Sequence, residues 1–132
     1  MLTAYRGTGK TWAALSIATA VATGGQFLTF EAPAPKRVLY IDGEMPATQL
    51  QDRIRRILPL MPDLDPNFLE IITPDLQERA LPDISTLTGQ IELDDWTHRA
   101  DLIVVDNLSS LARTGTENEA ESWTAVATWR CG

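Results

Sequence analysis

Short apolar runs alternate with longer amphipathic stretches along this chain. The runs are almost continuously apolar, which is typical of strands buried on both faces of a parallel sheet. They lie at residues 37–42, 68–72 and 102–105, with a further short strand predicted at 27–30. The stretches around them predict helices over residues 9–22, 46–58 and 86–97, and a last helix from about residue 119. The first helix is apolar on nearly all sides, which indicates that it packs against the sheet.

Glycine and proline residues separate these elements. Gly24 and Gly25 are expected to end the first helix, and Pro46 is expected in the first turn of the second. The alternation of strands and helices predicts an α/β domain with a mainly parallel sheet and right-handed crossovers. Ligands of such sheets bind at the carboxyl ends of the strands, so the residues that follow each strand are the first candidates for chemistry.

Helical spacing also predicts which side chains face the core and which face solvent. The inward-facing side chains of the second helix are expected to be Leu50, Ile54, Ile57 and Leu58. Those of the third are expected to be Ile91, Leu93 and Trp96. Three arginines of the second helix are expected on or beside its solvent face, namely Arg53, Arg55 and Arg56.

A glycine-rich segment leads into the first helix and reads Ala4-Tyr5-Arg6-Gly7-Thr8-Gly9-Lys10-Thr11. It follows the phosphate-binding pattern G-x-x-x-x-G-K-[ST], with Ala4 in place of the first glycine. Gly7 and Gly9 would let backbone N–H groups approach a polyphosphate. Lys10 would reach the β- and γ-phosphates, and the Thr11 hydroxyl would bind Mg²⁺. The alternative interpretation is a glycine-containing loop that only precedes a helix.

Asp106 directly follows the apolar run 102–105. This arrangement is typical of a Walker B strand, whose aspartate holds Mg²⁺ through water or positions the hydroxyl of the phosphate loop, here Thr11. The alternative is an aspartate that caps a turn between a strand and a helix.

Glu44 lies two residues after the strand that ends at Asp42. A carboxylate at this place can orient and partly deprotonate the water that attacks a γ-phosphate. The same place also suits a surface glutamate at the start of a helix, where the helix dipole favours it. Asp42 competes for the catalytic role or assists the metal.

Composition and charge narrow the class of protein. The chain has 132 residues, of which 44% are hydrophobic, and this size suits one soluble domain with one core. The net charge of −7 argues against binding of nucleic acid by the overall field of this segment. Cys131 is the single cysteine, which excludes an internal disulfide. No signal peptide or membrane-spanning run is found, so we expect a cytoplasmic protein.

Both ends of the chain suggest a fragment of a larger domain. Only three residues precede Ala4, although a phosphate-binding loop normally follows a buried strand. The other end, 129–132, falls within the last predicted helix. We therefore expect residues 1–132 to form a partial ATPase domain, truncated at both ends.

Three segments, 6–11, 37–46 and 101–108, together resemble the RecA-like P-loop ATPases. The resemblance is strongest to the branch around the plasmid replicative helicase RepA, often described as an AAA domain in phage and plasmid proteins. Glu44-Met45-Pro46 also resembles the core of DnaB-type helicases, and residues 117–123 look like the same branch.

The resemblance implies an ATPase that works as a ring, commonly a hexamer, coupled to single-stranded DNA in replication or recombination. It implies that Lys10 and Thr11 bind phosphates and Mg²⁺, that Glu44 is the catalytic glutamate, and that Asp106 is the Walker B aspartate. The implied positions around ATP are Arg6, Gly7, Thr8, Gly9, Lys10 and Thr11. The sensor of the γ-phosphate, the DNA-contacting loops and the arginine finger would lie outside this chain, and a neighbouring subunit would supply the finger.

Two other functions fit a phosphate-binding loop. A small-molecule kinase would need an acceptor pocket and an arginine-rich lid, for which the candidates are Arg53, Arg55 and Arg56. A nucleotide-binding assembly module would bind ATP without hydrolysing it.

Overall fold

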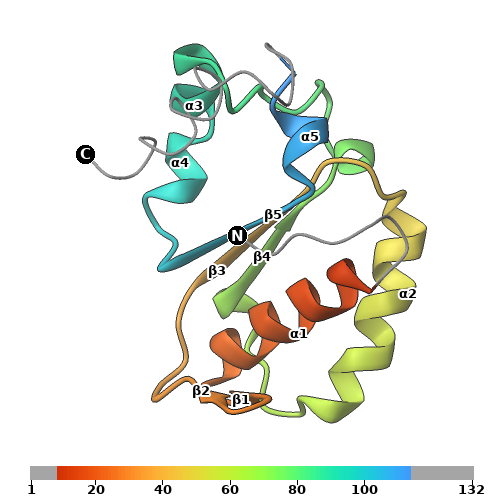
Figure 1. Cartoon of the computed structure of the whole chain (residues 1–132), viewed down its shortest axis with the longest axis vertical. Helices are drawn as coiled ribbons and strands as arrows, with labels where there is room; N and C mark the ends of the chain where they lie inside the picture. Colours follow the sequence, from red (N-terminus) through yellow and green to blue (C-terminus); the bar gives the residue numbers. More distant parts are fainter. Residues whose placement is uncertain (1–8, 114–132) are drawn as a thin grey trace.

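Three parallel strands form the centre of the protein, for which a computed structural model describes residues 9–113 (Figure 1). The strands are β3 (Val38–Asp42), β4 (Leu69–Ile72) and β5 (Leu102–Asp106). β3 lies in the middle and pairs in parallel with both neighbours. Each strand lies within one residue of its predicted position, because an almost continuously apolar run is what a strand covered on both faces requires. The predicted α/β fold with a parallel sheet is confirmed.

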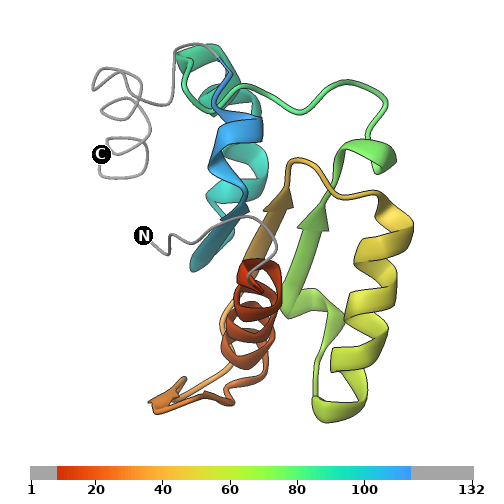
Figure 2. The same cartoon turned by 45° about the vertical axis from the view of Figure 1, so that its right-hand side comes forward.

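Helices cover both faces of this sheet (Figures 1 and 2). One layer consists of α1 (Lys10–Thr23) and α2 (Ala47–Ile57); the other consists of α3 (Leu87–Glu92), α4 (Asp94–Thr97) and α5 (Leu108–Leu111). Successive side chains of a strand point to opposite faces. Val38 and Tyr40 therefore pack with α1 and α2, whereas Leu39 and Ile41 pack with the other layer. All five residues of β3 are buried, which makes β3 the core of the fold.

The first helix has a glycine at each end. Gly9 precedes α1 with φ 84°, and Gly24 follows it with φ 68°. Both values lie in the left-handed region that glycine adopts without steric cost. The N–H of Gly24 donates to the carbonyls of Ala20 and Val21 and so satisfies the end of the helix. The predicted stop at Gly24 is confirmed.

The single strand predicted at 27–30 is wrong. The chain instead reverses within this segment and forms a small antiparallel hairpin of β1 (Gln26–Phe27) and β2 (Phe30–Glu31). Leu28 in the turn has φ 52°. Apolar content alone suggested one strand, but two intervening residues are enough for a tight turn.

The single helix predicted over 86–97 is also wrong, because it divides at Leu93 into α3 and α4. Two successive aspartates follow Leu93, and acidic residues favour the first turn of a new helix. Leu93 is buried, as predicted, and Trp96 is half-buried, but Ile91 is 64% exposed. The prediction that Ile91 faces inward was made for one continuous helix and fails with it.

The second helix ends one residue earlier than predicted. Pro59 follows the last turn, and the chain continues as a short 3₁₀ helix, η1 (Leu58–Leu60). The residue before a proline is disfavoured in a continuing α-helix. Leu50 and Ile57 are buried and Ile54 is half-buried, as predicted, whereas Leu58 is 41% exposed, contrary to the prediction.

Two more 3₁₀ helices flank β4, namely η2 (Pro66–Phe68) and η3 (Pro74–Leu76). The helix predicted from residue 119 lies outside the described residues, as do Cys131 and most of the phosphate-binding segment. Within residues 9–113, no helix combines the length and the hydropathy that crossing a membrane requires.

Candidate functional site

The carboxyl end of the sheet brings two predicted site residues together. Asp42 at the end of β3 is the direct register partner of Asp106 at the end of β5. The N–H of Gly43 donates to the carbonyl of Asp106 over 2.9 Å, so the two segments remain joined one residue beyond the end of β3. Asp42 and Asp106 also share the face of the sheet on which α1 packs, because they follow Tyr40 and Val104 at a spacing of two.

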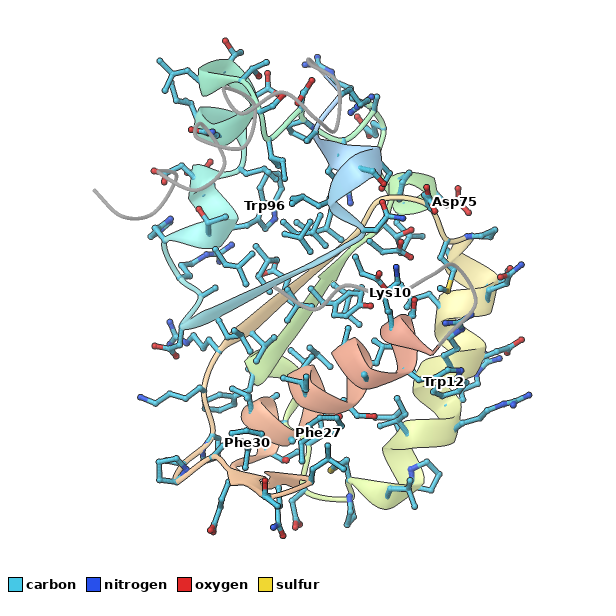
Figure 3. All side chains as sticks on the ribbon, viewed as in Figure 1. Lys10, Trp12, Phe27, Phe30, Asp75 and Trp96 are labelled. Atoms are coloured by element: carbon cyan, nitrogen blue, oxygen red, sulfur yellow. The ribbon has the colours of Figure 1, made fainter. Side chains whose placement is uncertain are left out.

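The N-terminus of α1 lies at this same end. Lys10 and Thr11 are the first two residues of the helix, and Figure 3 shows Lys10 at the tip of α1 beside the ends of the strands. A Cβ on Gly9 would meet nothing within 4 Å, so the positive φ and not crowding requires glycine there. Arg6, Gly7 and Thr8 lie outside the described residues.

Asp42 anchors the turn that carries Glu44. The Asp42 side chain is 2% exposed, and its Oδ1 accepts the N–H of Glu44 at 3.0 Å and that of Met45 at 3.1 Å. Within residues 9–113 its Oδ2 has no hydrogen-bond partner. Burial raises the pKa of Asp42; the two N–H donors oppose this change, and the charges of Asp106 and Glu44 add to it. Glu44 itself is exposed.

Tyr40 is a second buried polar residue beside the predicted site. Its ring is fully buried in the middle of β3, and its hydroxyl donates to Oδ2 of Asp106 over 2.8 Å. Burial raises the pKa of Tyr40 well above its usual range, and the bond to Asp106 and the charges of Asp106 and Asp42 raise it further. The charge of Arg53 acts in the opposite direction. Tyr40 was not predicted as a site residue, because a tyrosine within an apolar run is first interpreted as core.

The loop after β4 holds the segment between Glu44 and α2. The Thr73 hydroxyl donates to the carbonyl of Met45 over 3.2 Å, and Oδ2 of Asp75 accepts the N–H of Ala47 over 3.0 Å. Pro46 stands at the N-cap of α2 and offers no side-chain acceptor, so Asp75 takes that role from another segment. Neither Thr73 nor Asp75 was predicted from the sequence to have a role at this site.

The three arginines of α2 differ in their surroundings. Arg53 is half-buried, with its guanidinium carbon 5.4 Å from the centre of the Trp12 ring, which is a cation–π distance. Arg53 thus lies beside the solvent face, within the predicted range, and its contact with Trp12 joins α2 to the first turn of α1. Arg55 and Arg56 are exposed, as predicted, and Arg55 forms an exposed ion pair with Asp52.

The turn after β5 packs closely on the turn after β3. Asn107 caps α5 by accepting the N–H of Ser110. A Cβ on Gly43 would collide with the Ser110 side chain and approach Cγ of Leu111 to 3.0 Å. Gly43 is therefore required by close approach, and this contact fixes how the Glu44 turn lies against the end of β5.

Oxygen donors dominate this end of the sheet, and they are the ligands that Mg²⁺ prefers. Asp106 and the Thr11 hydroxyl are of the right chemical type, and the unpartnered Oδ2 of Asp42 adds an acceptor close by. In the described part of the chain, no three His, Cys, Asp or Glu side chains are grouped so that they could hold a metal by themselves. The residues therefore do not form a site that would enclose a metal with protein ligands alone. They fit a Mg²⁺ ion that keeps several waters and is also bound by phosphate oxygens.

Comparison with known proteins gives one result. A family model described as an AAA domain matches residues 1–130, nearly the whole chain. Neither the curated proteins nor the solved structures give a match.

Proposed function

The chain belongs to the AAA domain family of nucleotide-binding, ATPase-like proteins, and from this premise we propose that it binds and hydrolyses ATP with Mg²⁺. The observation that carries the proposal is the convergence of three segments at one end of the sheet. The N-terminus of α1, the turn after β3 and the end of β5 meet there. This is the end at which parallel sheets bind their ligands.

In this proposal the phosphates lie over the N-terminus of α1. Backbone N–H groups of Arg6, Gly7, Thr8 and Gly9 would surround them. Lys10 would bind the β- and γ-phosphates and take part in catalysis by stabilising their charge during hydrolysis. The positive end of the helix dipole favours an anion at this place. In support, α1 has no acidic residue in its first turn, so no side chain of its own competes for that place.

The Thr11 hydroxyl and the Asp106 carboxylate would hold Mg²⁺ together with phosphate oxygens and water. When bound, the metal neutralises charge on the phosphates. Asp106 suits this role because its backbone and its side chain are both tied to β3, through Gly43 and Tyr40.

Glu44 would orient the attacking water and accept its proton. It is exposed, so water can reach it, and its backbone is fixed by Asp42. Asp42 was the other residue predicted from the sequence as a candidate for this catalytic role. Its carboxylate is buried and already accepts two backbone N–H groups, and we therefore assign it to holding the turn and Glu44 to the chemistry.

The proposed biological process, ring assembly and DNA partner rest on the resemblance of residues 6–11, 37–46 and 101–108 to RecA-like ATPases. We propose a cytoplasmic ring-forming ATPase of DNA replication or recombination, of the plasmid or phage helicase type. Residues 1–132 would form part of its RecA-like core. A neighbouring subunit would supply the arginine finger, and segments outside this chain would contact single-stranded DNA.

The two alternatives have less support. A small-molecule kinase needs an acceptor pocket beside the phosphates, yet a cavity of about 550 Å³ opens on the face opposite α1, among Ile72, Leu81 and Trp96. Of the arginines proposed for a lid, Arg53 is engaged by Trp12. An assembly module that binds ATP without hydrolysis would not need an exposed carboxylate on an anchored turn.

The proposal is tested by calorimetric titration of ATP with Mg²⁺ into the chain, beside the Lys10→Ala variant. The matched control is Lys36→Ala, since Lys36 is an exposed lysine in the turn that precedes β3. Binding that is lost only with Lys10→Ala supports the proposal. A folded wild-type chain that binds no ATP would overturn it.

A further inference from the structure

Tyr40 stands where an apolar residue would satisfy the packing of β3. It lies between Leu39 and Ile41, and its ring packs with α1 and α2 in the same cluster as Leu15 and Leu50. A phenylalanine would fill the same volume. The hydroxyl adds one polar atom to a fully buried place, which is unfavourable unless that atom is hydrogen-bonded. Its partner therefore explains why a tyrosine fits this position.

That partner lies two residues further along the neighbouring strand. Tyr40 is in register with Val104, and its hydroxyl reaches diagonally to Oδ2 of Asp106 at 2.8 Å. The two side chains share one face of the sheet, so the bond runs along that face toward the carboxyl end of β5. A hydrogen bond to a carboxylate is among the stronger kinds in proteins.

This bond completes a two-point attachment of Asp106. The backbone carbonyl of Asp106 accepts the N–H of Gly43 over 2.9 Å, and the side chain accepts the Tyr40 hydroxyl. With the main chain and one carboxylate oxygen both tied to β3, the rotation of the side chain is restricted. The bond from Tyr40 does not use Oδ1, which remains an acceptor at the end of the strand.

From this geometry we propose that Tyr40 is a positioning residue, which holds the Asp106 carboxylate in the orientation that serves Mg²⁺ bound with nucleotide. The proposal rests on the ATP-binding function proposed above and adds a residue to its metal site. Groups that orient a metal ligand without touching the metal commonly change metal affinity by about 10- to 100-fold. Tyr40 would act through Asp106 alone, in contrast to a residue that only stabilises the core.

The test compares Tyr40→Phe with the wild-type chain, since this change removes the hydroxyl and keeps the ring. Calorimetry measures ATP binding in EDTA and over a series of Mg²⁺ concentrations. We expect the half-saturating Mg²⁺ concentration to rise about tenfold, with unchanged ATP affinity in EDTA. The matched control is Thr19→Val, which removes another buried hydroxyl of the α1 layer, one that donates to the α1 carbonyls of Leu15 and Ser16. We expect this control to leave the Mg²⁺ requirement unchanged.

A second pair of variants shows whether the effect passes through Asp106. In an Asp106→Ala background, adding Tyr40→Phe should raise the Mg²⁺ requirement no further. An unchanged requirement in Tyr40→Phe, an equal loss of affinity with and without Mg²⁺, or a loss of folding seen by circular dichroism would each overturn the positioning role. A wild-type chain that binds no ATP would overturn the proposed function itself, and the wild-type titration separates that failure from the others.

Discussion

The carboxylate of Asp42 holds the backbone of Glu44, because its Oδ1 accepts the Glu44 N–H at 3.0 Å. The same oxygen accepts the N–H of Met45 at 3.1 Å. A buried acid thereby fixes the turn on which an exposed acid is presented. This relationship separates two neighbouring carboxylates into an anchoring group and a group that water can reach, and it leads to a prediction for each.

In the complete ring-forming protein proposed above, Glu44→Gln should abolish ATP turnover and keep ATP binding. The amide retains the size of the side chain but cannot accept a proton, and loss of a general base commonly costs about 10²- to 10⁴-fold in rate. Phosphate release measures turnover, and calorimetry measures binding. Glu31→Gln is the matched control, since Glu31 is an exposed glutamate in the β1–β2 hairpin. Normal turnover in Glu44→Gln would remove this residue from the mechanism.

Asp42→Asn should stabilise the chain more at about pH 7 than at about pH 4. Burial raises the pKa of Asp42 above the ordinary value of 3.8, so the folded chain holds this proton more tightly than the unfolded chain. The free energy of unfolding of the wild type therefore falls as the pH rises from the ordinary pKa through the raised one. Asparagine carries no charge and keeps an acceptor for the two N–H groups.

Thermal unfolding of wild type and Asp42→Asn over this pH range checks that prediction. The difference in Tm between them should grow with pH in favour of the variant. Asp63→Asn, at an exposed aspartate, should show no such growth. A difference in Tm that stays constant or shrinks with pH would mean that the buried carboxylate is not destabilising when charged.

Gly43→Ala should lower the free energy of unfolding by about 1–3 kcal/mol, the usual range for overpacking. The added methyl group would meet the side chains of Ser110 and Leu111. Ser110→Ala should restore part of the loss when combined with it, because the hydroxyl is the atom nearest the new methyl group. Denaturant unfolding of the four chains of this double-mutant cycle measures the coupling. Strict additivity of the two changes would show that the turns after β3 and β5 do not pack as described.

The apolar runs were sufficient to predict the three strands of the sheet and their parallel arrangement. They also brought Lys10, Asp42 and Asp106 to one end of the sheet, because in parallel strands all carboxyl ends lie together. Such patterns depend on local composition and on the spacing of two or of about 3.6 residues. They predicted the long buried strands well, but they failed at the hairpin of 26–31 and at Leu58 and Ile91, which are exposed although helical spacing placed them inward.

The contacts of Tyr40 and Asp75 could not be predicted in this way. The bond from Tyr40 to Asp106 depends on the register between β3 and β5, and the bond from Ala47 to Asp75 depends on β4 being the neighbour of β3. Each joins residues far apart in the sequence, and no local pattern specifies such a pair. The prediction of one strand at 27–30 failed for a different reason. A two-residue turn can reverse a short apolar run without glycine or proline, and here it forms the hairpin at 26–31.

Asp75→Ala should destabilise α2 at its N-terminus. Asp75 supplies the acceptor for the N–H of Ala47 that Pro46 cannot supply, and loss of a helix cap costs about 1 kcal/mol. For a chain of this size that corresponds to a fall in Tm of roughly 4 °C.

Asp75→Asn is the control for this prediction, since it keeps an acceptor oxygen and should remain close to wild type. Because the loop after β4 also binds the carbonyl of Met45 through Thr73, fraying of α2 should loosen the Glu44 turn, and turnover should fall by a smaller factor than in Glu44→Gln. Equal Tm values for the alanine and asparagine variants would show that the hydrogen bond from Ala47 does not stabilise the helix.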